Sequence, residues 1–215
     1  MRRKMNEPME IGFLPSLNNE LDFYTNQIVM TEYVVPLDEG ITDVSYYRKI
    51  IMMLESATEN DLVRIKIDNG GGSLTTALHL STAIKQCAAQ TIAEIVCECH
   101  SAASVIALAC DDWEVAPWAH MLVHNAEYGL GIAKAPDIAQ HVAFSQKQLA
   151  RVLGEVYDGF LSKTEISKAI KGEQLYFDNV QIIERLEKLK AKREAEIMKE
   201  MKDAQGKPAS TKDRA

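Results

Sequence analysis

Ser104 and its neighbours are the first residues whose types and spacing suggest chemistry. The segment Ile92–His100 is rich in β-branched residues and predicts a buried strand. Small residues follow, and then the apolar run Val105–Cys110, which predicts a tight turn and a buried helix beginning near Ser104. A serine in the first helical turn lies beside unpaired N–H groups, where an oxyanion is stabilised as acyl transfer requires. Serine is also a preferred N-cap, and this purely structural interpretation stays open.

A glycine-rich turn is the second feature. The alternating segment Leu62–Asp68 predicts a strand, and Asn69–Ser73 (Asn-Gly-Gly-Gly-Ser) interrupts it. A backbone without side chains can approach a ligand closely and present its N–H groups. The turn lacks the Gly-Lys-Ser/Thr ending of a phosphate-binding loop. A turn that simply requires positive φ is an equally good interpretation.

His124 is the third feature, because it ends the short predicted strand Met121–His124. A lone histidine at a strand end is usually an ordinary polar residue. In parallel sheets, however, the functional crevice lies at the carboxyl ends of the strands. The sequence therefore predicts that Ser104, the glycine turn and His124 share one edge of a sheet.

Composition excludes several other classes. The 215 residues are 47% hydrophobic and 26% charged, as in soluble globular proteins, and the net charge of −7 disfavours nucleic acid or an anionic membrane as a partner. The basic start is not followed by the apolar stretch of a signal peptide. The four cysteines lie in apolar surroundings, which predicts reduced thiols in the cytoplasm. Cys97 and Cys99 would share a strand face that His100 does not, and no second Cys/His pair follows, so we predict no metal site.

The chain divides into three parts: an N-terminal arm (1–24), a compact domain (25–178), and a charged C-terminal helix with a disordered tail (179–215). Within the domain, periodicity predicts strands near 26–36, 62–68, 92–99 and 121–124 and helices over 43–56, 74–88, 136–158 and 163–171. This alternation predicts an α/β fold with a largely parallel sheet. The helix over 136–158 carries apolar residues on more than one face, which predicts contacts with another subunit.

Four segments together resemble the Clp protease proteolytic subunit (ClpP) family. They are the glycine turn Ile67–Ser73, the Ala-Ala-Ser motif within Ser101–Val105, the histidine strand Met121–Asn125, and the Gly-rich turn leading into the long helix, Gly129–Ile138. The resemblance covers about residues 25–178. It implies a ClpP/crotonase-type fold with repeated β-β-α units, a protruding handle helix and a serine endopeptidase activity. The charged C-terminal helix is an addition to that pattern.

Carried over residue by residue, the resemblance makes Ser104 the nucleophile and His124 the general base. It places the oxyanion hole at the backbone N–H groups of Gly72 and Val105. The stretch after the glycine turn would bind the substrate backbone as an added strand. The implied substrate-binding residues are Gly71, Ser73, Leu74 and Asn125.

The triad acid and the end of the domain depart from the family. Aligning Ile166 and the segment Leu175–Phe177 puts Glu173 where the family has an aspartate, with Asp178 as a second candidate. The stretch from Ser104 to His124 is a few residues shorter than usual. The family's closing Gly-Leu-Ile-Asp segment is replaced by the charged helix.

The resemblance also implies partners. They are polypeptide substrates, other copies of the chain in heptameric and possibly stacked rings, and a separate AAA+ unfoldase that alone would use ATP. The chain itself would need no cofactor, metal, nucleic acid or membrane. Three alternatives stay open: a phage-encoded protease that matures capsid or scaffold proteins, a catalytically inactive structural or regulatory homologue, and a crotonase-type acyl-CoA enzyme. The last would leave Ser104 and His124 without a role.

Overall fold

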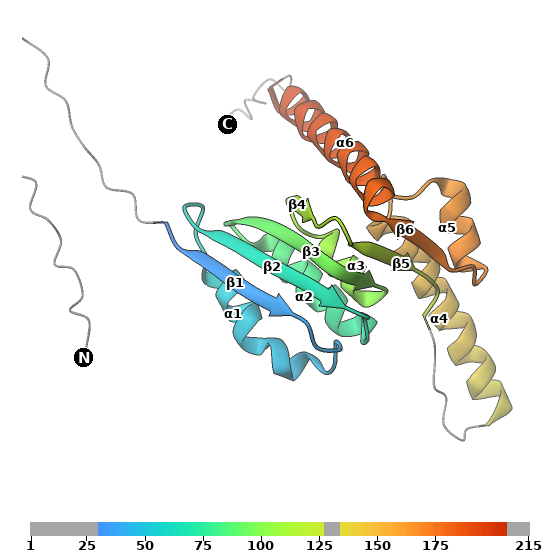
Figure 1. The fold of residues 1–215 in the computed structure, drawn as a ribbon. Helices are drawn as coiled ribbons and strands as arrows, with labels where there is room; N and C mark the ends of the chain where they lie inside the picture. The colour runs from blue at the N-terminus through green and yellow to red at the C-terminus, as the bar shows by residue number, and fades with distance from the viewer. Residues whose placement is uncertain (1–29, 127–133, 206–215) are drawn as a thin grey trace, which may run out of the picture.

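A six-stranded sheet forms the centre of the computed structural model, which describes residues 30–126 and 134–205 (Figure 1). The strands lie in the order β1-β2-β3-β5-β6, and β4 also pairs with β3. All pairs are parallel except β5 with β6. The strands are β1 (Glu32–Leu37), β2 (Leu62–Asn69), β3 (Gln90–His100), β4 (Asp112–Val115), β5 (His120–Val123) and β6 (Leu175–Asp178).

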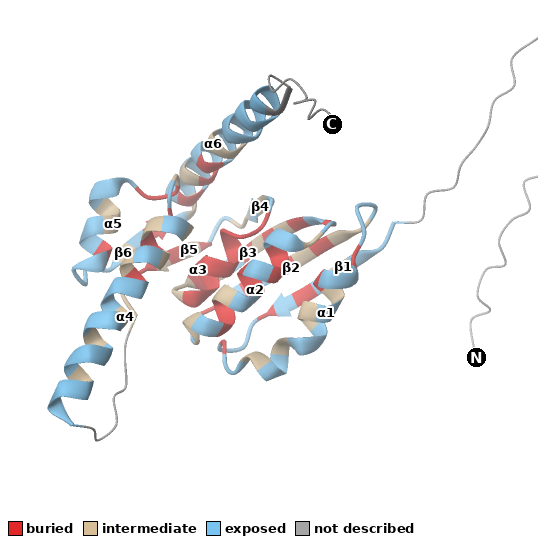
Figure 2. Ribbon diagram, turned by 180° about the vertical axis from the view of Figure 1, so that it is seen from behind, coloured by how far each residue is buried: buried red, intermediate tan, exposed pale blue. Residues whose placement is uncertain are grey.

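Helices α1, α2 and α3 cover one face of the sheet, and α4, α5 and α6 gather at its β5–β6 end (Figures 1 and 2). A short 3-10 helix, η1, precedes α1. The bounds are η1 (Val44–Tyr47), α1 (Arg48–Ser56), α2 (Leu74–Gln86), α3 (Ala102–Ala107), α4 (Ala135–Val156), α5 (Lys163–Ile170) and α6 (Asn179–Gln205). No helix in the described part of the chain is both long and apolar enough to cross a membrane.

The core lies between the sheet and α1–α3. In β2, the alternating residues Val63, Ile65 and Ile67 are at most 3% exposed, while the residues between them point to the other face. Helix α3 is buried along its whole length, because its small and apolar residues pack between β3 and α2. This packing fixes the start of α3 against the carboxyl end of β3, where the predicted site lies.

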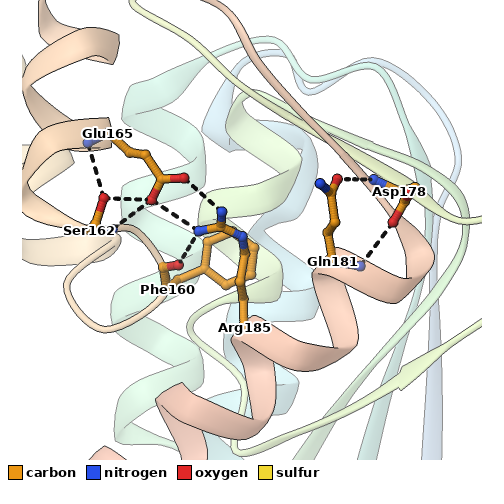
Figure 3. A network of polar contacts seen from close by, with 6 residues as sticks. All are labelled: Phe160, Ser162, Glu165, Asp178, Gln181 and Arg185. Atoms are coloured by element: carbon orange, nitrogen blue, oxygen red, sulfur yellow. Dashed lines mark hydrogen bonds and ion pairs between the residues drawn. The ribbon is translucent and has the colours of Figure 1, made fainter.

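Helix α6 is held to the domain by a polar network (Figure 3). Arg185 forms an ion pair with Glu165 at 2.7 Å and donates a hydrogen bond to the Phe160 carbonyl at 3.0 Å. Its guanidinium also lies 4.3 Å from the Phe177 ring centroid, a cation–π contact. Arg185 thereby joins α6 to α5, to β6 and to the turn after α4.

The mixed α/β fold with a largely parallel sheet is confirmed. Most predicted helices and strands are found within a few residues of their expected bounds. However, β4 and β6 were not predicted, β1 begins at Glu32 rather than near residue 26, and α3 begins at Ala102 rather than near Ser104. The predicted arm over residues 1–24, the Gly-rich turn from Gly129 and the tail beyond residue 205 lie outside the described residues.

Candidate active site

Ser101 occupies the junction between β3 and α3 in a left-handed conformation. Its φ of 53° and ψ of −120° make it the one non-glycine residue with positive φ among residues 30–126 and 134–205. Such a conformation costs about 1–3 kcal/mol and persists where the surroundings enforce it. Here the Ser101 N–H donates to the Leu122 carbonyl of β5 at 2.8 Å. Ser101 is the N-cap residue of α3, yet its side chain makes no capping hydrogen bond.

The glycine turn packs directly against this junction. A Cβ on Gly71, whose φ is 100°, would lie 2.8 Å from the His100 carbonyl oxygen and 2.9 Å from Ser101 Cβ. Only glycine fits there without displacing the backbone around Ser101. The buried Asn69 side chain holds the turn, because it accepts from the Gly71 N–H at 2.7 Å and donates to the Glu39 carbonyl at 2.6 Å.

A cavity of about 500 Å³ opens where these elements meet. Its wall combines backbone of the glycine turn, the first residues of α2 and α3, the end of β5 and one face of α4. The lining residues are Gly70, Gly72, Ser73, Leu74, Thr75, Ser101, Ala102, Val105, His124, Ala126, Leu149, Val152, Leu153 and Tyr157. The structure thus brings Ser101, His124 and Gly72 to one cavity at the carboxyl ends of the strands.

Two further histidines lie on neighbouring strands, His100 at the end of β3 and His120 at the start of β5. The rings of His100 and His120 meet edge to face, with centroids 4.9 Å apart. Burial lowers the pKa of His100 against the opposing effect of Glu98, and the nearby His120 and His124 lower it further.

Ser104, the predicted nucleophile, does not line this cavity. It is completely buried, and its hydroxyl donates to the Ser101 carbonyl at 2.7 Å and lies 2.7 Å from the Tyr157 hydroxyl. A nucleophile must present its oxygen to the substrate carbonyl. The burial and hydrogen bonds of Ser104 do not support its assignment as nucleophile, and the serine of this motif that lines the cavity is Ser101, three positions earlier.

The start of α3 also bears on the predicted oxyanion donors, the N–H groups of Val105 and Gly72. Because α3 begins at Ala102, the Val105 N–H lies beyond the first four N–H groups and belongs to the ladder of the helix itself. Val105 is therefore not a donor, although it lines the cavity. The N–H of Ala102 is one of the unpaired groups at the helix start, and Gly72 lies on the same cavity.

The two candidate acids lie at opposite ends of β6. Leu175 pairs with Val123, so Glu173 lies at the end of β6 near His124, where its carboxylate forms an ion pair with Lys168 at 3.3 Å. Asp178 pairs with His120 at the other end and exchanges hydrogen bonds with Gln181 (Figure 3). Four residues of strand separate His120 from His124, about 13 Å. This register places Glu173, rather than Asp178, at the end of β6 that lies beside His124.

The sequence also matches a known protein family. The model of the Clp protease family matches residues 19–171 of the chain. The chain belongs to the Clp protease family. No curated protein matches the sequence. Membership makes this Clp protease a peptidase, that is, a hydrolase, in a family whose members act on polypeptides and form oligomeric rings.

Two of the four predicted substrate-binding residues of the Clp protease line the cavity, namely Ser73 and Leu74. Gly71 and Asn125 are not among the lining residues. The Asn125 side chain instead donates a hydrogen bond to the Ile170 carbonyl at 3.1 Å. Helix α2 begins at Leu74, with Ser73 as its N-cap, so a substrate cannot add as a strand along the residues after the glycine turn. Of the three glycines of the turn, Gly70 and Gly72 line the cavity wall.

Burial makes Cys99 and Cys110 poor nucleophiles. It raises the pKa of the Cys110 thiol to about 12 and raises that of Cys99 as well. Across residues 30–126 and 134–205, no group of three or more His, Cys, Asp or Glu side chains is arranged to hold a metal ion. Within the described cavity, hydroxyl and imidazole groups are thus the available chemistry.

Sequence reasoning missed Ser101, Ala102 and Tyr157 as members of the site. One signal pointed to Ser101: measured from Ser104, the stretch to His124 is a few residues shorter than the family pattern, and counting from Ser101 adds three residues. Tyr157 could not be found in this way, because its contact with Ser104 joins residues 53 positions apart.

Proposed function

We propose that this Clp protease is a serine endopeptidase with Ser101 as nucleophile and His124 as general base. The observation that carries the proposal is the left-handed backbone of Ser101 at the strand-to-helix junction, on the same cavity as His124. A sharp, strained turn of this kind exposes the serine oxygen at the top of a sheet. The buried and doubly hydrogen-bonded Ser104 has no comparable access.

The reaction follows from this arrangement. His124 takes the proton of Ser101 as the serine oxygen attacks the scissile carbonyl carbon. The N–H groups of Ala102 and Gly72 would stabilise the resulting oxyanion. The C–N bond then breaks as His124 returns the proton to the leaving amine, and a water molecule, deprotonated by His124, hydrolyses the acyl-Ser101 ester.

Glu173 is the proposed partner of His124. It lies at the right end of β6, and at its Lys168 ion pair both side chains are about half exposed, so the carboxylate can exchange partners with little cost. A carboxylate beside the imidazole would fix its tautomer and stabilise the imidazolium. Leu74, Val105 and Leu153 give the cavity apolar walls, which favour an apolar side chain of an unfolded polypeptide.

The proposed assembly is a ring of identical subunits, heptameric and possibly stacked, that receives chains from an AAA+ unfoldase. Phe144 on α4 is 62% exposed, which supports a subunit contact along that helix. The free thiols of Cys87, Cys97, Cys99 and Cys110 support a reducing compartment such as the cytoplasm. A capsid-maturation role would share the same site and differ in its substrate.

Hydrolysis of a fluorogenic peptide and of unfolded casein tests the proposal. Ser101→Ala and His124→Ala should each lower kcat at least about 10³-fold, because nucleophile and base act as one unit. The matched control is Ser81→Ala. It removes a buried hydroxyl on α2 that donates to the Val105 carbonyl of α3. Full activity of Ser101→Ala would overturn the proposal, and no activity in the wild type as an intact oligomer would favour the inactive homologue.

A further inference from the structure

A chain of hydrogen bonds runs from α4 to the backbone of Ser101. The Ser104 hydroxyl donates its one proton to the Ser101 carbonyl at 2.7 Å. The Tyr157 hydroxyl, 2.7 Å from the Ser104 oxygen, must therefore be the donor in that second bond. Ser104 is 0% exposed and Tyr157 is 3% exposed, so both bonds lie in a water-excluded interior.

The carbonyl at the end of this chain shares a peptide plane with an oxyanion donor. The peptide unit between Ser101 and Ala102 is planar and trans, so the Ala102 N–H points opposite to the Ser101 C=O. The Ser101 carbonyl accepts from both the hydroxyl and the N–H of Ser104, the latter at 3.0 Å. Holding the carbonyl in this way also fixes the direction of the N–H of Ala102, a residue that lines the cavity.

The same bonds stabilise the strained conformation of Ser101. A residue at a φ of 53° relaxes unless several contacts hold it. In a low-dielectric interior, hydrogen bonds in series also polarise one another, so a bonded Ser101 carbonyl makes the Ala102 N–H a stronger donor. Tyr157 is the C-cap residue of α4, so the position of α4 enters the geometry of the site.

We propose that Ser104 and Tyr157 are positioning residues that orient the Ala102 N–H for the oxyanion. The inference rests on the proposed function, with Ser101 as nucleophile. It assigns the second serine of the Ser-Ala-Ala-Ser motif to the transition state rather than to nucleophilic attack. It also predicts that a perturbation of α4 acts on kcat through Tyr157.

Ser104→Ala and Tyr157→Phe test the inference in the full-length protein. Removing one oxyanion donor outright costs about 10²–10³ in kcat, so loosening one should lower kcat about 10- to 100-fold, with KM changed less than about twofold. The inhibition constant of a peptide boronic acid, which mimics the tetrahedral intermediate, should rise by the same factor as kcat/KM falls. The kcat of the double variant should equal that of the less active single variant, because the two bonds act in series.

Ser81→Ala controls for the loss of a buried hydroxyl and should leave kcat and inhibitor binding unchanged. Tyr157→Phe keeps the aromatic packing, so the test survives if Ser104→Ala fails to fold. Unchanged kcat in both variants would overturn the inference. A loss of kcat that is proportional to the loss of thermal stability, with unchanged inhibitor binding, would overturn it as well. Activity in Ser101→Ala would instead overturn the proposed nucleophile, which separates the two failures.

Discussion

The hydroxyl oxygen of Ser104 lies 2.7 Å from the phenol oxygen of Tyr157, which is 53 residues further along the chain. Burial raises the pKa of Tyr157 far above its ordinary value. Because Ser104 donates its one proton to the Ser101 carbonyl, the phenol is the donor in this contact. The contact ties α3 to the end of α4 inside the core. It explains why Ser104, the last residue of the Ala-Ala-Ser motif, can be structural while Ser101, three positions earlier, faces the cavity.

Gly71 is the glycine whose replacement should damage the site most directly. Gly71→Ala forces a Cβ within 3 Å of the His100 carbonyl and Ser101 Cβ at a φ that alanine rarely adopts. We expect a loss of about 1–3 kcal/mol in the free energy of unfolding and a large loss of kcat. Gly154→Ala is the matched control, since nothing lies within 4 Å of its Cβ in α4. It should gain about 0.5–1 kcal/mol, and urea unfolding of both variants checks the prediction. Equal behaviour of the two variants would contradict it.

Glu173 and Asp178 can be separated by kinetics. If Glu173 orients His124, Glu173→Gln should lower kcat about 10²- to 10⁴-fold, because an amide can hold the wrong tautomer. Asp178→Asn should keep kcat and lose at most about 1 kcal/mol from its bonds with Gln181. Full activity of Glu173→Gln would show that the acid comes from elsewhere, either another segment or another subunit.

The Glu165–Arg185 pair should make stability depend on pH. The hydrogen bond from Arg185, assisted by bonds from Ser162, lowers the pKa of Glu165 to about 2 in the folded protein. The unfolded carboxyl titrates near its ordinary pKa of about 4.3. Because the folded pKa is the lower one, the stabilisation is complete above the unfolded pKa of about 4.3 and is lost as the pH falls toward the folded pKa of about 2.

Glu165→Gln should remove this part of the pH dependence. At pH 7 it should also destabilise the protein by about 1–3 kcal/mol, because Arg185 then loses its charged partner. Urea midpoints at pH 7, 4 and 3 measure both effects. Glu196→Gln, at a 3.8 Å pair with Lys192 in which the glutamate is mostly exposed, is the control and should change stability by at most about 0.5 kcal/mol. A wild type and a Glu165→Gln variant with parallel pH profiles would refute the assignment.

Phe144 tests the proposed contact between subunits. Most of α4 is exposed in the isolated chain (Figure 2), and Phe144 is 62% exposed. Burying such a side chain contributes about 1.5–3 kcal/mol per subunit. Phe144→Asp should shift the oligomer to smaller species in light scattering, whereas Gln146→Asp on the same helix should not. An unchanged mass for Phe144→Asp would place the interface elsewhere.

The sequence was sufficient for the architecture because periodicity reports burial. Alternation in β2 and the 3.6-residue pattern of α2 follow directly from the core, and both elements lie where they were expected. Strands β4 and β6 were missed because four residues of mixed exposure carry too little pattern to identify a strand. His124 and Gly72 were found because each follows a strand end.

The nucleophile could not be assigned from local pattern alone. Ser101 and Ser104 are both serines in the same small-residue turn, and the choice depends on where α3 begins, a boundary that periodicity leaves uncertain by several residues. The contacts that favour Ser101 are distant in sequence, namely Leu122 to the Ser101 N–H and Tyr157 to Ser104.

The most direct test of the central claim is to map the site of a fluorophosphonate adduct on the wild-type protein by tandem mass spectrometry. The reagent phosphonylates an activated serine oxygen. With Ser101 as nucleophile, the adduct should lie on Ser101, vanish in Ser101→Ala and His124→Ala, and persist, at a reduced rate, in Ser104→Ala. An adduct on Ser104, or labelling that survives Ser101→Ala, would contradict the account.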